Sequence, residues 1–286
     1  LYVWERGPGV LHEDEAALRL CALCRNEFMT ASQVREGKIE LTAAIDGLFQ
    51  VNRRRLNAVN ALEDIMIATR HGNTAVRKGG KLAGTRVIPL VIAEEKLRRA
   101  EEAAGSTPLL TLTPWKLKTA AVIATGNEVA KGLITDAFTP VVEAKLTAFG
   151  IRTVRRSTPG DDMDKITQEI LAARNAGVDL ILCTGGMSVD PDDRTPGAVR
   201  ASGARVVSYG APVLPGAMFL VSYLEGVPVL GLPGCVMYAQ STIFDLLLPR
   251  IAAGVPISRK DITEMGEGGL CLGCDICTYP DCGFGK

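Results

Sequence analysis

Two short turns in the second half of the chain have residues that could bind an anionic ligand. Thr125-Gly126-Asn127-Glu128 follows an apolar run at residues 119–124. Thr184-Gly185-Gly186-Met187-Ser188 follows a similar run at residues 178–183. Glycine lets the backbone approach a ligand closely, and exposed backbone amides bind anions. Neither turn is a G-x-G-x-x-G or Walker A sequence, so a classical dinucleotide or P-loop site is unsupported. The alternative is that the paired glycines merely end a strand.

Three carboxylates follow the second turn within four positions, at Asp190, Asp192 and Asp193. Placed side by side they would repel one another, and a hard divalent cation such as Mg²⁺, bridging a carboxylate to a phosphate or pterin-linked oxygen, would relieve the repulsion. The alternative is a solvated acidic loop in which Thr195 caps a short helix. Asp136 can likewise cap a helix that starts near residue 137. A magnesium site and a set of helix caps both remain open from the residues alone.

From residue 117 onward, strand-like and helix-like segments alternate. Strands are expected at residues 119–124, 151–156, 178–183, 205–208 and 227–230, and helices at 139–149, 163–175, 196–201 and 236–248, the last stopped by Pro249. This βαβα order predicts an α/β open sheet, in which ligands bind outside the carboxyl ends of the strands. Both glycine turns fall at such ends.

The first part of the chain mixes short strands and helices differently. Helices are expected at residues 10–27, 53–64 and 93–104, a hairpin or short strands at 38–51, a strand at 65–69, and short strands joined by a turn within 74–93. Residues 108–114 have the composition of a connector. We therefore expect a smaller α+β domain over residues 1–115, an α/β domain over 116–255 and a cysteine-rich tail over 256–286.

Five short motifs occur in the α/β region. They are Thr125-Gly126-Asn127-Glu128, Gly132-x-Ile134-x-Asp136, Asp161-Asp162, Thr184-Gly185-Gly186-x-Ser188-Val189-x-Pro191-x-Asp193-x-Thr195-Pro196 and Leu232-Pro233-Gly234. In this order they resemble the molybdopterin-binding domain family, which has the MoaB/Mog fold and is shared with MoeA-type molybdenum insertases. The resemblance covers roughly residues 116–252. It implies a three-layer α/β/α domain with a mostly parallel sheet.

The resemblance also implies a ligand and a set of site residues. The ligand is molybdopterin or its adenylylated form, bound with Mg²⁺, and the reaction is MoeA-type transfer of molybdenum to adenylylated molybdopterin. Asp193 and Asp136 would hold Mg²⁺ and so act in catalysis. The implied cofactor-binding residues are Thr125, Gly126, Asn127, Glu128, Thr184, Gly185, Gly186, Met187, Ser188, Asp193, Pro233 and Gly234. The family typically assembles as homo-oligomers.

Some positions depart from the family's pattern. Asn127 stands where the family commonly has Asp, and Cys235 stands where the insertases often have Asn. The lost carboxylate puts catalysis in doubt more than binding, so a second hypothesis is a non-catalytic carrier or chaperone that holds the cofactor for a recipient molybdoenzyme. A third is hydrolysis of a related nucleotide pyrophosphate. The N-terminal region resembles the leading part of MoeA-like proteins, for example at Ala83-Gly84-Thr85-Arg86.

Four of the eight cysteines crowd together near the end of the sequence, as Cys271, Cys274, Cys277 and Cys282. Four thiolates at short spacing can bind Zn²⁺ tetrahedrally or hold an iron–sulfur cluster. The spacing is close to the bacterial ferredoxin run C-x2-C-x2-C-x3-C-P, which favours the cluster slightly over zinc. The alternative is a flexible tail with reduced thiols.

Composition limits the class of partner. Lys plus Arg and Asp plus Glu both number 32, so the formal net charge is zero and the basic footprint of a nucleic-acid-binding protein is absent. No apolar stretch is long enough for a transmembrane helix, and the N-terminus lacks the pattern of a signal peptide. We therefore expect a cytoplasmic protein with no nucleic-acid or membrane partner, and the family resemblance implies a small-molecule pterin ligand.

Overall fold

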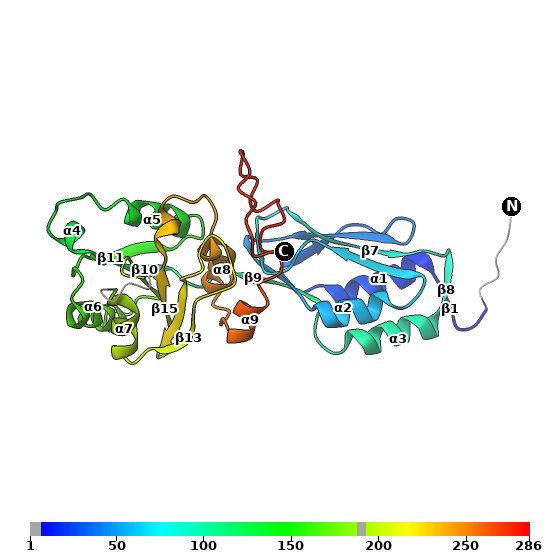
Figure 1. Ribbon diagram of the computed structural model, residues 1–286. Coiled ribbons are helices and arrows are strands. Elements are labelled where there is room, and N and C mark those ends of the chain that lie inside the picture. Colours follow the sequence, from blue (N-terminus) through cyan, green and yellow to red (C-terminus); the bar gives the residue numbers. More distant parts are fainter. Residues whose placement is uncertain (1–6, 188–192) are drawn as a thin grey trace. The chain divides into compact units, whose positions relative to one another are not determined.

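The computed structural model describes residues 7–187 and 193–286 (Figure 1). The chain divides into two compact units, Leu1–Pro114 and Trp115–Lys286. This division lies next to the boundary expected near residue 115. Residues 256–286, expected as a separate tail, are part of the second unit.

In its described residues 7–114, the first unit combines three small sheets with three helices, which lie along one side of the long strands in Figure 1. The largest sheet is antiparallel, with the order β2-β3-β7-β5. The strands are β1 (Val10–His12), β2 (Met29–Ala31), β3 (Lys38–Ala43), β4 (Gly47–Val51), β5 (Ile65–Thr69), β6 (Thr74–Val76), β7 (Lys81–Val87), β8 (Val91–Ala93) and β9 (Leu110–Pro114). The helices are α1 (Glu13–Cys24), α2 (Arg53–Asn60) and α3 (Glu94–Ala104).

One prediction for this unit was wrong in detail. The helix expected from residue 10 begins at Glu13, because Val10–His12 pairs as a strand with Val91–Ala93. Of the two alternatives expected for residues 38–51, the structure has the short strands and not the hairpin. The two strands belong to different sheets, since β3 pairs with β2 and β7 whereas β4 pairs with β6 and β9. These partners are distant in sequence, so local turn chemistry does not reveal them.

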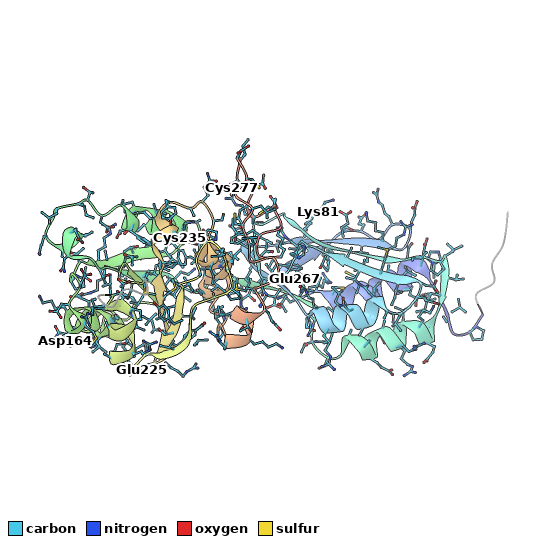
Figure 2. The ribbon with its side chains drawn as sticks, in the orientation of Figure 1. Lys81, Asp164, Glu225, Cys235, Glu267 and Cys277 are labelled. Atoms are coloured by element: carbon cyan, nitrogen blue, oxygen red, sulfur yellow. The ribbon has the colours of Figure 1, made fainter. Side chains whose placement is uncertain are left out.

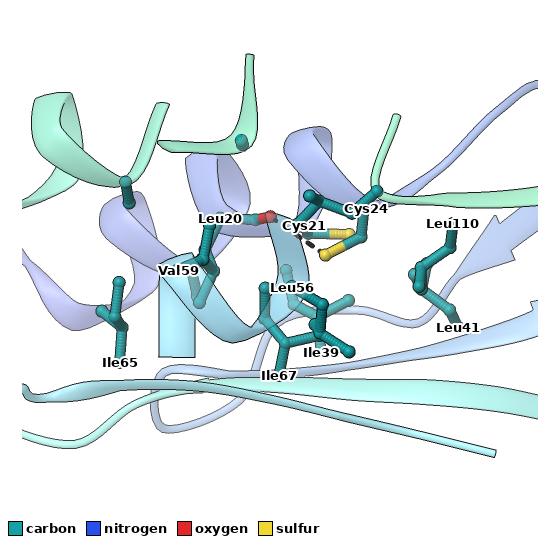
Figure 3. Close-up of a cluster of buried hydrophobic side chains, with 14 of the residues drawn as sticks. Leu20, Cys21, Cys24, Ile39, Leu41, Leu56, Val59, Ile65, Ile67 and Leu110 are labelled. Atoms are coloured by element: carbon teal, nitrogen blue, oxygen red, sulfur yellow. Dashed lines mark hydrogen bonds between the residues drawn. The ribbon is translucent and has the colours of Figure 1, made fainter. Parts of the chain in front are cut away.

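The core of the first unit is apolar and encloses two of the cysteines (Figure 3). Cys21 and Cys24 of α1 are both buried, and the thiol of Cys24 donates a hydrogen bond to the carbonyl oxygen of Leu20 at 3.4 Å. Burial raises the pKa of Cys24 to about 12. The thiolate is the form of cysteine that reacts and binds metals, and burial disfavours it. We therefore interpret this C-x2-C pair as apolar core residues.

The second unit is built on a six-stranded mixed sheet with the order β11-β10-β12-β15-β14-β13. Its strands are β10 (Thr119–Ala124), β11 (Arg152–Ser157), β12 (Leu180–Thr184), β13 (Arg205–Tyr209), β14 (Leu220–Leu224) and β15 (Val227–Leu232). Its helices are α4 (Asn127–Ala130), α5 (Phe138–Thr147), α6 (Met163–Asn175), α7 (Thr195–Ala201), the 3-10 helix η1 (Gly234–Met237), α8 (Ile243–Ala252) and α9 (Arg259–Thr263). Among the described ranges, no helix is long and apolar enough to cross a membrane.

Alternate residues of β10 face opposite helix layers. Ala120 and Val122 pack in one cluster with residues of α5 and α8, whereas Ala121 and Ile123 pack in the other with residues of α6 and α7. A strand buried on both faces must be apolar at every position, which explains the uninterrupted run in the sequence. The predicted three-layer α/β/α domain with a mostly parallel sheet is confirmed.

The strand order reverses between β10 and β12. From β10 the chain crosses to β11 on one side, and from β11 it crosses back past β10 to β12. Because β10, β11, β12 and β15 are parallel to one another, their carboxyl ends share one edge of the sheet. The reversal makes the space beside β10 and β12 at this edge the expected ligand position in an open α/β sheet.

The closing helix differs from the one predicted over residues 236–248. The capping box of Thr242 and Asp245 starts α8, and Pro249 lies inside the helix instead of stopping it. A proline lacks the N–H that would bond the carbonyl four residues earlier, here that of Asp245. The hydroxyl of Tyr279 donates to this Asp245 oxygen at 2.9 Å. The C-terminal segment therefore satisfies a carbonyl that Pro249 leaves without its helical partner.

We expect Tyr279→Phe to lower the free energy of unfolding by about 1 kcal/mol, because the Asp245 carbonyl loses its donor. Urea unfolding of the full chain measures the change. Tyr238→Phe is the matched control, since the Tyr238 side chain is 77% exposed and its hydroxyl can bond to water. Equal losses from the two substitutions would contradict this account of Pro249.

Candidate functional site

The two glycine turns meet at the carboxyl edge of the sheet. The amide of Thr125 donates to the carbonyl oxygen of Thr184 at 2.8 Å, and the Thr125 hydroxyl is 3.0 Å from the same oxygen. These bonds continue the pairing of β10 and β12 for one residue past the end of β10. The turns predicted separately from sequence are therefore side by side.

The second turn can be built only with glycine. Gly185 and Gly186 have φ values of +85° and +53°, in the left-handed region. A Cβ on Gly185 would lie 2.7 Å from the carbonyl oxygen of Thr125, and one on Gly186 would lie 2.8 Å from the hydroxyl oxygen of Thr195. The Thr195 hydroxyl donates to the Gly185 carbonyl at 2.9 Å. The turn is thus folded tightly over two threonine hydroxyls.

Two carbonyls of this turn, those of Gly185 and Met187, accept hydrogen bonds from side-chain hydroxyls. The backbone nitrogens of Gly185, Gly186 and Met187 donate to no acceptor among the described residues. The carbonyl oxygen of Met187, in contrast, accepts a hydrogen bond from the Tyr209 hydroxyl at 3.2 Å. Consecutive unused amides at a left-handed turn suit an anion such as a phosphate.

Asp193 lies beside this turn with an unsatisfied oxygen. Its Oδ2 is buried and has no hydrogen-bond partner among the described residues. Burial raises the pKa of Tyr209, and the nearby Asp193 carboxylate raises it further, against the opposite effect of Arg200. An unpartnered buried carboxylate oxygen is costly, and a cation bound there would relieve the cost. Asp193 therefore fits the predicted role of a magnesium ligand.

The structure gives Asp136 a different partner set. Its Oδ1 accepts from the amides of Phe138 and Thr139 at 2.9 and 3.0 Å, and its Oδ2 accepts from the Thr139 hydroxyl. Both oxygens are therefore used in capping α5, the role that the sequence left open beside magnesium binding. The structure does not supply Asp136 with a free oxygen for a metal.

The first turn is tied to the loop after β11. The amide of Asn127 donates to Asp161 Oδ2 at 2.9 Å, and the Asp161 amide donates to Asn127 Oδ1 at 3.4 Å. Gly126 has a φ of +124°, and Glu128 is exposed. Asn127 thus links the first turn to the loop after β11 by hydrogen bonds to Asp161, whereas Glu128 is exposed to solvent.

The remaining predicted residues fall at the same edge or outside the described ranges. Pro233 and Gly234 follow β15 and begin η1. Ser188, Asp190 and Asp192 lie outside the described residues.

Sequence reasoning missed Tyr209, the last residue of β13. Since β13 runs parallel to β15, it ends at this edge, and a hydroxyl-bearing aromatic at a strand end was the available signal.

The four C-terminal cysteines do not converge in the structure. Cys271 and Cys282 are half-buried, whereas Cys274 and Cys277 are exposed, and all are free thiols. The Sγ of Cys277 is 3.7 Å from the hydroxyl oxygen of Ser241 (Cys277 is labelled in Figure 2). Within residues 7–187 and 193–286, no three His, Cys, Asp or Glu side chains are gathered to hold a metal. Their metal role stays a prediction.

Part of the second unit matches a known protein family. Residues 121–253 match the family described as "Probable molybdopterin binding domain". This segment contains the carboxyl edge and all of its turns. This match agrees with the resemblance drawn from the five motifs, for this part of the chain.

Curated relatives divide between two kinds of protein. A CinA-like protein of Thermotoga maritima is 37% identical over 83 residues, which is 29% of this chain and 20% of that protein. A molybdopterin molybdenumtransferase of Staphylococcus aureus is 29% identical over 126 residues, 42% of this chain and 30% of that protein. The chain therefore spans less than a third of the length of each of these relatives.

Two solved structures resemble the second unit. CinA from Thermoplasma acidophilum has a TM-score of 0.40 at 21% identity and covers 47% of this chain and 98% of that chain. MoaB from Thermus thermophilus has a TM-score of 0.39 at 17% identity and covers 50% of this chain and 99% of that chain.

We expect Gly185→Ala to destabilise the protein more than Gly203→Ala. The two glycines have nearly equal φ values, +85° and +87°, but a Cβ on Gly203 has nothing within 4 Å. Gly203→Ala should cost about 1 kcal/mol for the left-handed backbone. Gly185→Ala should add roughly 1–3 kcal/mol for the clash with Thr125. Urea unfolding of both variants checks this, and equal costs would show that the turn is not held against Thr125.

Proposed function

We propose that the protein binds molybdopterin, or its adenylylated form, at the carboxyl edge of the second unit and acts in molybdenum cofactor biosynthesis. One observation carries the proposal: within the described part of the chain, three consecutive amides of the Gly185–Met187 turn donate to no acceptor, and the buried Oδ2 of Asp193 has no hydrogen-bond partner. The family match over residues 121–253 supplies the chemical identity of the ligand.

The turn and the carboxylate have complementary parts in binding. The amides of Gly185, Gly186 and Met187 donate to the phosphate of the ligand, and Tyr209 fixes the turn through the Met187 carbonyl. Asp193 Oδ2 would hold Mg²⁺, which supplies charge neutralisation and polarisation of a phosphate when bound. The Thr125 and Thr195 hydroxyls keep the turn in the shape that presents its amides.

The reaction that we propose is MoeA-type transfer of molybdenum to adenylylated molybdopterin. It is supported by the partial similarity to molybdopterin molybdenumtransferases. In this reaction, the amide turn orients the phosphate, and Asp193 positions the cation beside it. Both groups are preformed at the sheet edge, so little rearrangement accompanies binding.

A second candidate is a carrier that binds the cofactor for a recipient molybdoenzyme without turnover. It is favoured by the engagement of Asp136 in the α5 cap and of Asn127 with Asp161. Among the described residues of this edge, Asp193 is the carboxylate whose unbonded oxygen is buried. A homo-oligomer is a further expectation from the family resemblance.

Titration of the full chain with molybdopterin in the presence of Mg²⁺ tests the proposal. Saturable binding is expected, and Asp193→Asn should weaken it about tenfold or more, because a charge-assisted contact to the cation is lost. Asp164→Asn is the control, since Asp164 is exposed on α6 (Figure 2) and should leave the affinity unchanged.

Each outcome of this titration decides one claim. Absence of saturable binding by the unaltered protein would contradict the proposed function. Equal affinities of the Asp193 and Asp164 variants would remove Asp193 from the site. Adding molybdate to the adenylylated complex then separates the two candidates, because release of AMP with formation of the molybdenum cofactor requires the transferase and its absence supports the carrier.

A further inference from the structure

A second unpartnered polar group lies at the carboxyl edge of the sheet, at the end of β11. Ser157 is the last residue of this strand. Its hydroxyl oxygen is shielded from solvent and has no hydrogen-bond partner among the described residues. The residue as a whole is half-buried, so this oxygen lies close beneath the surface of the edge. Because an unpartnered buried hydroxyl costs free energy, a group that bonds to it is expected.

The strand register places Ser157 on the same face of the sheet as the glycine turn. Ser157 pairs with Ile123 of β10, and paired residues of neighbouring strands point to the same face. Ile123 packs in one cluster with Met187 of the turn and Val199 of α7. The free hydroxyl and the turn with unused amides therefore belong to one side of the edge.

Arg155 extends this polar face of β11. Its Nη2 donates to Oε2 of Glu169 on α6 at 2.7 Å, whereas its Nε is buried and has no partner among the described residues. Side chains two positions apart on a strand are neighbours on one face. β11 thus carries an unused N–H donor at Arg155 and, nearer the edge, a hydroxyl at Ser157 that can donate or accept.

The order of the strands allows one ligand to reach both the turn and β11. β10 lies between β11 and β12 in the sheet (Figure 1). The end of β11 is therefore two strand spacings, roughly 10 Å, from the Gly185–Met187 turn at the end of β12. The ring system of molybdopterin is several bonds away from its phosphate. A phosphate bound at the turn leaves the rings to extend over the end of β10 toward Ser157.

We propose that Ser157 and Arg155 bind the ring system of the ligand, at the carbonyl and adjacent N–H of its pterin lactam. Arg155 Nε donates to the carbonyl, and the Ser157 hydroxyl accepts from the N–H. This inference rests on the proposed function and adds the residues that distinguish a pterin from other molecules with a phosphate. A site with buried polar groups discriminates strongly against a ligand that leaves them unpaired.

Titration of the full chain with molybdopterin, AMP and inorganic phosphate tests this subsite. Ser157→Ala should weaken molybdopterin binding roughly threefold to tenfold, because one hydrogen bond to the ligand is lost. Arg155→Lys keeps a cation for Glu169 but lacks the Nε–H, and it should cause a similar loss. The affinities for AMP and phosphate should stay unchanged, because neither molecule contains a lactam.

Thr153→Val is the matched control. Thr153 is also on β11 and also has a buried hydroxyl without a partner among the described residues. It pairs, however, with Ala120, which packs on the opposite face with α5 and α8. Thr153→Val should therefore bind molybdopterin as tightly as the unaltered protein. Urea unfolding of the two hydroxyl variants should show little loss of stability, since each removes a group that is bonded to nothing in the protein.

The outcomes separate this subsite from the proposed function. Molybdopterin binding that is equally tight in Ser157→Ala and the unaltered protein, or an equal loss of AMP binding, would overturn the subsite and leave the proposed function in place. A loss of affinity in Ser157→Ala that is matched by a loss of folding stability would also overturn it. Absence of molybdopterin binding by the unaltered protein would contradict both.

Discussion

The close approach of the Gly185-Gly186 turn to Thr125 and Thr195 is the constraint on which the rest of the site depends. A side chain at either glycine would lie within 3 Å of oxygen atoms of these threonines. The carbonyl of Gly185 accepts a hydrogen bond from Thr195, whereas the amides of residues 185–187 donate to no acceptor among the described residues. A single steric requirement thus shapes the turn that we propose to bind the ligand's phosphate at the end of β12.

The sheet makes this edge a common meeting point for distant residues. Four parallel strands end there, so residues from 125 to 234 contribute to one surface. β13 brings Tyr209 to the same edge, where its hydroxyl holds the Met187 carbonyl. Among the described residues the buried Oδ2 of Asp193 has no partner, and this oxygen is the one that we propose binds the cation.

The sequence predicted those parts of the fold that local pattern determines. The limits of β10 and α6 follow from an apolar run and from an Asp162 cap, and both were predicted to the residue. β14 and the interior position of Pro249 were not predicted, because they depend on pairing with β13 and β15 and on the Tyr279 hydroxyl. Long-range partners of this kind leave no local signal.

The same distinction applies to the site. The glycine turns were recognisable because each follows a buried strand, whereas Asp136 and Asp193 look alike in sequence and differ only in their partners. Tyr209 joins the site through tertiary packing alone. The motif series pointed to the same family that residues 121–253 match, and the geometry then separated the carboxylate that caps a helix from the one with a buried, unbonded oxygen.

A crystal structure of the full chain with molybdopterin and Mg²⁺ tests the central claim most directly. The account predicts the ligand's phosphate within hydrogen-bond distance of the amides of Gly185, Gly186 and Met187, with Asp193 Oδ2 bound to the cation. A phosphate bound at the opposite edge of the sheet, or Asp193 turned away from the cation, would contradict it.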